Sequence, residues 1–370
     1  MKKSCSLIAL ALTLGLASCA PTAQQGGGQV NPADVLFTFS TVGDSREDPA
    51  AEGLNGQNKI WLQNTRAWTR IMKESNAQGA KAMFFNGDMI MGYTTDRATL
   101  DRQYAFWRGM SATLMEQGTY VVPVPGNHEV QEKGTDAAGK GFKLARAGNE
   151  DAWRANMGDL ILDKLRFQAL TGLDAKNFDA ANTPQVGGAD PVTTDQKQLT
   201  YSFDADNSHF AIINTDATGW DSHAPVGWLK ADLAAAKARG LNHFFVFGHK
   251  PAYTYKYNDK VTPSGFDADP ANQTAFWDLV EQYGATYFSG HEHIYHAMQP
   301  RADKAGKAWE VIVGSGGSPF EAKPGDSTNP QDYMYAWATV QVLKDGRVHA
   351  TVYGFDQKFG TTQILKSWDL

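Results

Sequence analysis

The feature that most constrains the fold of this chain is a series of short apolar, β-rich runs that each stop at a turn containing glycine. Helical spacing of apolar residues follows several of these runs, for example at 58–75 and 97–116. Strands that alternate with helices form sheets with helices on their faces, and the functional loops lie at the carboxyl ends of the strands. We therefore expect an α/β protein. The runs that end at such turns lie at 35–42, 82–85, 120–124, 243–247 and 285–289.

The turns after these runs carry carboxylate, amide and imidazole side chains. Oxygen and imidazole donors without thiolate suit Zn, Mn or Fe. A single pair such as His291 and His293 is weak evidence, but several other strand ends share the same chemistry. The sequence therefore indicates a metal site. Its candidate ligands are Asp44, Asp88, Asn127, His249, His291 and His293.

The alternation of strands and helices is interrupted at 130–199, where only 151–170 has a helical pattern. A stretch this long inside a compact domain is more often a functional insertion than a plain loop. Because it directly follows a motif turn, we predict a cap beside the site, with a surface decoration as the alternative. Further strands are expected at 199–203, 209–214, 309–313, 335–343, 348–353 and 363–366, and further helices at 225–239 and 271–283.

Composition limits the class of protein. Of the 370 residues, 42% are hydrophobic and 20% are charged, which is typical of a globular chain with a sizeable core. The net charge of −6 does not favour the binding of a polyanion, so the chain has no nucleic-acid-binding signature. Nothing in the sequence indicates an oligomeric state.

The N-terminus has the pattern of a targeting segment. Lys2 and Lys3 precede an apolar stretch, Leu7 to Leu16, that is too short to span a bilayer comfortably. The stretch ends in Leu16-Ala17-Ser18-Cys19, which resembles the bacterial lipobox, in which the cysteine carries the lipid. An ordinary signal peptide that contains a cysteine is the alternative.

This pattern predicts the domain organisation and the location of the protein. Residues 1–18 are expected to form a lipoprotein signal peptide, with lipidation at Cys19. The glycine-rich segment 19–33 would be a flexible tether, and 34–370 the folded domain. We expect an extracytoplasmic bacterial lipoprotein, anchored to the membrane in the periplasm or on the cell surface.

The order and local sequence of the five motifs closely resemble the calcineurin-like metallophosphoesterase superfamily, and within it the purple-acid-phosphatase-like branch. The resemblance spans about residues 35–355 and implies a four-layer α/β/β/α sandwich of two mixed sheets flanked by helices. The motifs are Gly43-Asp44, Gly87-Asp88, Gly126-Asn127-His128-Glu129, Gly248-His249 and Gly290-His291-Glu292-His293.

The resemblance implies a dinuclear centre of two divalent or mixed-valence transition-metal ions, with Fe, Zn or Mn as the candidates. Such a pair can clamp both oxygens of an in-line phosphoryl displacement and activate water as hydroxide. His128 would be the general acid at the leaving group, and Glu129 would orient it. By this resemblance Asp88 bridges the ions, Asp44 and His293 hold the first, and Asn127, His249 and His291 hold the second.

The sequence departs from the family at the first ion. Many relatives have histidine two residues after the first aspartate, where this chain has Arg46, and the purple enzymes have tyrosine at the position of Met91. A guanidinium has no lone pair to donate, so the first ion lacks one protein ligand. Water, Tyr93 or Asp48 could complete it. Arg46 would either contact the substrate phosphate, as a catalytic and substrate-binding group, or pair with a motif carboxylate.

The sequence therefore predicts a metal-dependent phosphoesterase that hydrolyses a phosphate ester through metal-activated hydroxide. Tyr253, in the alternating series that follows His249, is a candidate for the wall of the substrate cleft, although such alternation is as common in simple packing. The alternative function is a non-catalytic or mononuclear ligand-binding lipoprotein that retains the fold. The departure at Arg46 is its sequence support.

Overall fold

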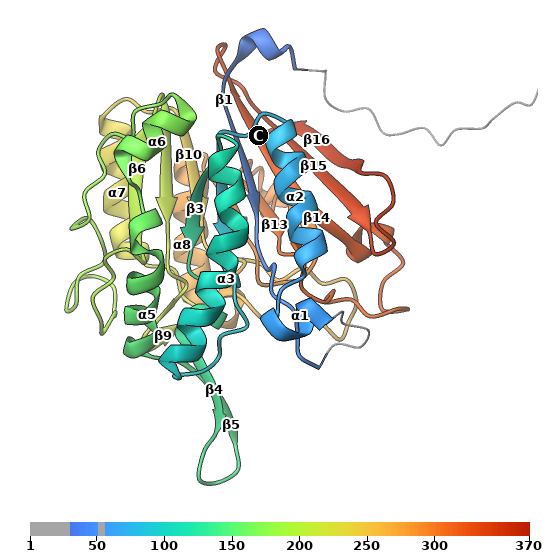
Figure 1. Ribbon diagram of the computed structural model, residues 1–370. Helices are drawn as coiled ribbons and strands as arrows, with labels where there is room; N and C mark the ends of the chain where they lie inside the picture. Colours follow the sequence, from blue (N-terminus) through green and yellow to red (C-terminus); the bar gives the residue numbers. More distant parts are fainter. Residues whose placement is uncertain (1–29, 51–55) are drawn as a thin grey trace, which may run out of the picture.

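The computed structural model describes residues 30–50 and 56–370, and it contains two large mixed sheets with helices on their outer faces (Figure 1). The first sheet has the order β16-β15-β14-β1-β2-β3, and β1, β2 and β3 run parallel. Its strands are β1 (Val35–Val42), β2 (Ala82–Asn86), β3 (Tyr120–Val124), β14 (Met334–Leu343), β15 (Val348–Asp356) and β16 (Gln363–Asp369).

The second sheet has the order β12-β13-β11-β10-β7-β6, and its central strands β13, β11, β10 and β7 are mutually parallel. Its edge strand β12 follows the last predicted metal-ligand turn and was not predicted. The strands are β6 (Tyr201–Ala205), β7 (Ser208–Ile212), β10 (His243–Phe247), β11 (Thr286–Ser289), β12 (Tyr295–Met298) and β13 (Trp309–Val313).

The two sheets pack face to face through phenylalanine side chains. The rings of Phe84 and Phe247 stack with centroids 3.9 Å apart, and those of Phe39 and Phe245 meet edge to face at 5.0 Å. Because side chains alternate between the faces of a strand, Phe85 points the other way, and its ring contacts Trp68 at 4.9 Å. The runs that read as buried strands are therefore covered on both faces.

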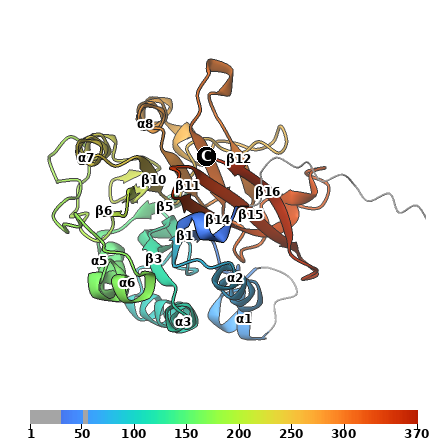
Figure 2. The same ribbon diagram turned by 90° about the horizontal axis from the view of Figure 1, so that it is seen from above.

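Helices complete the outer layers, and the view in Figure 2 shows them on opposite sides of the paired sheets. The first sheet is covered by α1 (Gly56–Trp61), α2 (Thr65–Ala77) and α3 (Arg97–Glu116). The second is covered by α7 (Val226–Ala238) and α8 (Pro270–Tyr283). This arrangement confirms the expected α/β/β/α sandwich.

Two of the predicted helices are wrong in their extent. The pattern at 58–75 is divided into α1 and α2, because Leu62 takes a φ of 53° and Asn64 caps α2 by accepting from the Ala67 N–H at 3.1 Å. The pattern at 151–170 is likewise divided into α5 (Ala147–Met157) and α6 (Lys164–Thr171), and Asp163 caps the second helix. In both cases a capping side chain interrupts a continuous apolar pattern.

The segment 130–199 begins with a two-stranded hairpin that projects from the body of the molecule in Figure 1. The hairpin consists of β4 (Gln131–Thr135) and β5 (Gly141–Ala145), and it follows the short helix α4 (Asn127–Val130). Further along, α5 packs beside α3, and Trp153 of α5 is fully buried. The segment therefore includes elements that belong to the core, and its action as a cap stays a prediction.

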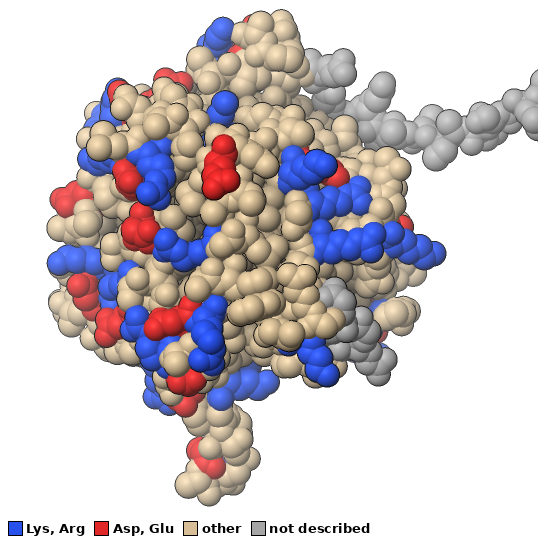
Figure 3. All heavy atoms as spheres, in the orientation of Figure 1, with Lys and Arg blue, Asp and Glu red and all other residues tan. Residues whose placement is uncertain are grey.

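Short elements complete the secondary structure. Strands β8 (Asp216–Ala217) and β9 (Trp220–Asp221) form a small two-stranded sheet, and the 3₁₀ turns are Pro32–Asp34, Gly158–Leu160, Phe266–Ala268, Ala302–Lys304 and Pro330–Tyr333. Basic and acidic side chains are interspersed over the face shown in Figure 3. Within the described ranges no helix is both long and apolar enough to cross a bilayer. The predicted signal peptide at 1–18 and Cys19 lie outside the described residues.

Candidate metal centre

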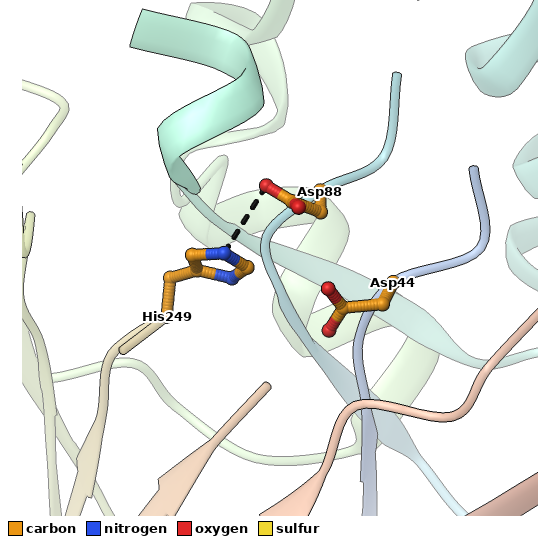
Figure 4. Close-up of side chains that lie close together, drawn as sticks. All are labelled: Asp44, Asp88 and His249. Carbon is orange, nitrogen blue, oxygen red and sulfur yellow. Dashed lines mark ion pairs between the residues drawn. The ribbon is translucent and has the colours of Figure 1, made fainter. Parts of the chain in front are cut away.

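The predicted ligands meet where the strands of both sheets end. Asp44 follows β1, Asp88 follows β2, and His249 follows β10, and Figure 4 shows their side chains facing a common space. Ligand atoms of these three buried residues all lie within 4.8 Å of one another. Asp44 and Asp88 have φ angles of 62° and 54°, which are uncommon outside glycine and are typical of functional turns.

Four of the predicted ligand atoms form one close cluster. Nε2 of His249 lies 3.1 Å from Oδ1 of Asp88 and 2.8 Å from Oδ1 of Asn127. Nδ1 of His291 lies 2.9 Å from the same Asn127 oxygen and 3.2 Å from His249 Nε2. An ion with ligand bonds of roughly 2.0–2.2 Å separates neighbouring ligand atoms by roughly 2.8–3.6 Å. The cluster therefore fits the coordination shell of one transition-metal ion.

Hydrogen bonds outside the cluster fix the orientation of its members. His249 donates its Nδ1–H to the carbonyl oxygen of Asn86 at 2.7 Å, which leaves the lone pair of Nε2 facing the cluster. The amide nitrogen of Asn127 donates to the hydroxyl of Tyr93, so the amide oxygen faces the histidines. Such partners set the direction of metal ligands before the metal binds.

The electrostatics of the cluster favour a cation. Burial alone would lower the pKa of His249, but the charge of Asp88 and its hydrogen bond raise it to about 9. Burial would raise the pKa of Asp88, but His128 and His249 hold it well below its usual range. Burial also keeps His291 neutral by lowering its pKa. The field that attracts a proton to His249 attracts a metal ion to the same lone pair.

Arg46 lies among the residues expected to hold the first ion. Its Nε is 3.2 Å from Oδ2 of Asp88, and its Nη2 is 3.2 Å from Nε2 of His293. The sequence left two roles open for Arg46, contact with the substrate phosphate or an ion pair with a motif carboxylate. The ion pair is present in the structure. Three donors were expected here, and two of them already contact a cationic side chain. While Arg46 keeps these two contacts, the residues do not fit a second ion.

Asp44 is the third residue expected at the first ion. Its Oδ2 accepts the backbone N–H of His291 at 2.9 Å, and its Oδ1 lies 3.5 Å from Nε2 of His293. Within the described part of the chain, this buried Oδ1 has no hydrogen-bond partner. Burial raises the pKa of the Asp44 carboxyl well above its usual range.

Comparisons with known proteins give the family. The profile described as calcineurin-like phosphoesterase matches residues 60–295, which is more than half of the chain. The chain belongs to the calcineurin-like phosphoesterase family. The matched range contains the turns of Asp88, Asn127, His249 and His291, and it begins after the turn that carries Asp44 and Arg46. No match is found among curated proteins.

Solved structures of phosphatases are similar to this calcineurin-like phosphoesterase. A purple acid phosphatase from yellow lupin (Lupinus luteus) seeds is similar with a TM-score of 0.55 and 15% identity, over 90% of this chain and 53% of that one. The chain thus spans about half the length of the lupin protein. A dimetal phosphatase from Danio rerio has a TM-score of 0.45 and 14% identity, over 90% of this chain and 99% of that one. The likeness to the lupin structure shows the fold.

Two residues of the Asn127 turn, His128 and Glu129, were expected to act at the leaving group. His128 donates its Nδ1–H to the carbonyl of Met91, and its Nε2 lies 3.6 Å from Oδ2 of Asp88. It therefore faces the centre, and its action as a general acid stays a prediction. Glu129 hydrogen-bonds backbone N–H groups of the Gly126 and Asp88 turns instead of the ring of His128. The structure gives Glu129 no contact by which it would orient that ring.

Tyr253 is not among the residues of the centre. Its ring packs against Trp277 of α8 at 5.3 Å, and it lies partly buried against the core on the outer face of the second sheet. The structure thus provides no support for Tyr253 as a cleft wall. Lys250, beside a ligand, is buried, and its Nζ pairs with Asp216 at 2.7 Å.

Sequence patterns missed one residue beside the centre. Lys143, on strand β5 of the hairpin, holds its Nζ 5.0 Å from the ring centre of Tyr93. Burial and the neighbouring Lys133 and Lys250 lower its pKa. A lysine in a segment without clear periodicity carries no sequence signal, because only the folding of the hairpin brings it here.

Proposed function

We propose that this calcineurin-like phosphoesterase is an extracytoplasmic enzyme that hydrolyses a phosphate ester with water activated by a bound transition metal. The observation that carries the proposal is the convergence of Asp88, Asn127, His249 and His291 in one buried volume. A divalent ion held by these residues would polarise a phosphoryl oxygen and bring the pKa of a water near neutral. Fe, Zn and Mn all suit the oxygen and imidazole donors.

The residues around this cluster supply charge and proton transfer. Arg46 presents a planar guanidinium, which suits a phosphate oxygen better than a point charge does. His128 has its Nδ1–H committed to Met91, so Nε2 is the atom that would exchange a proton with the leaving group. The family implies two ions. The four-atom cluster fits one of them, and Arg46 contacts two of the residues expected to hold the other.

The test of this function is turnover after metal reconstitution. Protein loaded with Zn²⁺, Mn²⁺ or Fe²⁺ should hydrolyse p-nitrophenyl phosphate or its bis ester, and His291→Ala should lose most of that activity with its fold retained. His223→Ala is a matched control, because His223 pairs with Asp269 outside the cluster. Absence of turnover with every metal on both esters would refute the enzymatic function.

We also propose that the protein is anchored to a membrane through a lipid on Cys19. Support comes from the charged and apolar pattern before that cysteine. Expression of the whole chain in a bacterium should give a membrane-associated protein whose first residue is a lipidated Cys19, as seen by mass spectrometry. Cys19→Ser should release it from the membrane fraction, and unchanged membrane association would count against the anchor.

The alternative function, a non-catalytic or mononuclear ligand-binding lipoprotein, is favoured by one observation, the contact of Arg46 with two expected ligands. Such a protein would bind a phosphate ester without hydrolysing it. Isothermal titration with phenyl phosphate, followed by analysis of the recovered ester, separates the two functions. Intact ester after long incubation with metal-loaded protein supports the alternative.

A further inference from the structure

The side chain of Arg46 is held from several directions. Its backbone N–H donates to the Asp88 carbonyl at 3.4 Å, and its carbonyl accepts from the Ser318 hydroxyl at 2.8 Å. The side chain is 9% exposed, and its Nε pairs with Asp88 at 3.2 Å. Because hydrogen bonds fix both the backbone and the guanidinium of this buried arginine, it is an integral residue of the centre.

In the contact between Arg46 and His293, the guanidinium is the hydrogen-bond donor and the imidazole is the acceptor. His293 donates its Nδ1–H to the carbonyl of Pro319 at 2.7 Å, so its Nε2 carries a lone pair. The Nη2 of Arg46, at 3.2 Å, therefore donates to the nitrogen that would otherwise bind an ion. A guanidinium is a donor at every nitrogen and stays charged in proteins. It satisfies Asp88 and His293 as a cation would, without using a metal, while Oδ1 of Asp44 has no hydrogen-bond partner among the described residues.

We propose that the guanidinium of Arg46 takes the place of the first ion, so that the centre works with one transition-metal ion and one arginine. The proposal deepens the proposed function and rests on it. The single ion would be held by Asp88, Asn127, His249 and His291, and Arg46 would supply the second positive charge. Asp88 then joins an ion to a guanidinium through its two oxygens, as the distances to His249 and Arg46 indicate.

This arrangement leaves Arg46 able to act on the substrate. Within residues 30–50 and 56–370, Nε and Nη2 have hydrogen-bond partners and Nη1 has none. An oxygen of a phosphate ester can accept from this third nitrogen, which lies in the same plane. A phosphate monoester or diester would then be bound between a metal ion on one side and an arginine on the other.

The count of bound ions tests the proposal without any measurement of activity. Metal-free protein is titrated with Mn²⁺ by calorimetry, desalted and analysed for manganese. The wild type should bind one equivalent, and its electron paramagnetic resonance spectrum should be that of an isolated ion. Arg46→His removes the guanidinium and adds an imidazole beside Asp44, Asp88 and His293. This variant should bind two equivalents, and two ions about 3.5–4 Å apart should show magnetic coupling.

The control is Arg102→His, which places an imidazole on the exposed surface of α3, where Arg102 contacts Thr99. It should bind the same number of ions as the wild type. Two tightly bound, coupled ions in the wild type would overturn the proposal, and so would an Arg46→His variant that folds but still binds one. Failure of the proposed function would be seen separately, as one bound ion without hydrolysis of either ester.

Discussion

Glu129 supports the turn that presents Asp88, and its substitution gives a prediction that can be worked from the structure. Its Oε2 accepts the N–H groups of Gly126 at 2.8 Å and Asp88 at 2.9 Å. Its Oε1 accepts those of Met89 at 2.8 Å and Ile90 at 3.1 Å. The carboxylate is fully buried, so water cannot replace it as the acceptor. Glu129→Gln leaves one acceptor oxygen and brings an amide NH₂ against two N–H donors.

The magnitude follows from the two N–H groups that lose their acceptor. A buried donor left unpaired costs about 1–3 kcal/mol, so Glu129→Gln should lower the free energy of unfolding by about 2–6 kcal/mol. That is a large part of the 5–15 kcal/mol that is typical of a domain. Urea unfolding followed by tryptophan fluorescence measures it. The titration is done with a chelator present, so that loss of a metal does not contribute.

The matched control is Glu132→Gln on strand β4. Glu132 is partly exposed and pairs with Arg146 at 2.9 Å, and such a pair contributes about 0–1 kcal/mol. A loss below about 1 kcal/mol for Glu129→Gln as well would refute the reasoning. It would mean that the four N–H groups find other acceptors, and that the Asp88 turn does not depend on this carboxylate.

Two further predictions concern pH and metal. Burial would lower the pKa of His209, but its hydrogen bonds to Asp204 at 2.7 Å and Asp232 at 2.9 Å raise it. The contribution of His209 to the free energy of unfolding should therefore be complete below the unfolded pKa of about 6.5 and be lost as pH rises through the raised folded pKa. Urea titrations at several pH values measure this dependence, and His209→Gln should remove it. Removal of the metal by a chelator should lower the free energy of unfolding by about 2.7 kcal/mol relative to protein with free metal at 100 times the Kd. His291→Ala should show no such difference in thermal unfolding with and without Mn²⁺.

The alternation of strands and helices was predictable because the strand pattern is strong, and the family resemblance implied the two-sheet sandwich. The run that contains Phe84 and Phe85 is apolar at every position, as expected for a strand covered on both faces, and the structure places one ring in each layer. The helix boundaries were less predictable, because Asn64 and Asp163 act as caps inside apolar patterns that would continue without them. Periodicity shows which residues are apolar, and not where a polar side chain caps the start of a new helix.

The positions of the candidate ligands were predictable for a different reason, which is that each follows a strand whose end is fixed by the sheet. Side-chain direction is not fixed in this way. Tyr253 is near His249 in sequence, yet its ring turns toward α8, where Trp277 offers an apolar surface. Lys143 is far from every motif, yet the hairpin brings it to Tyr93. Residues between the elements depend on tertiary packing, which the pattern of one chain does not contain.

The shape of Arg46, and not only its charge, decides whether it can replace an ion. It reaches Asp88 through Nε and His293 through Nη2, two nitrogens fixed in one plane. Lysine presents its three N–H donors from a single nitrogen, so it cannot match the planar spacing of Nε, Nη2 and Nη1. Arg46→Lys should therefore retain one Mn²⁺ equivalent but lower kcat/KM by about 10²–10³, the cost of losing one fixed donor to developing charge. Arg46→Met, which removes the charge as well, should lower it further. Full activity in Arg46→Lys would show that a point charge is sufficient and that the planar contact to Asp88 and His293 does not contribute to catalysis.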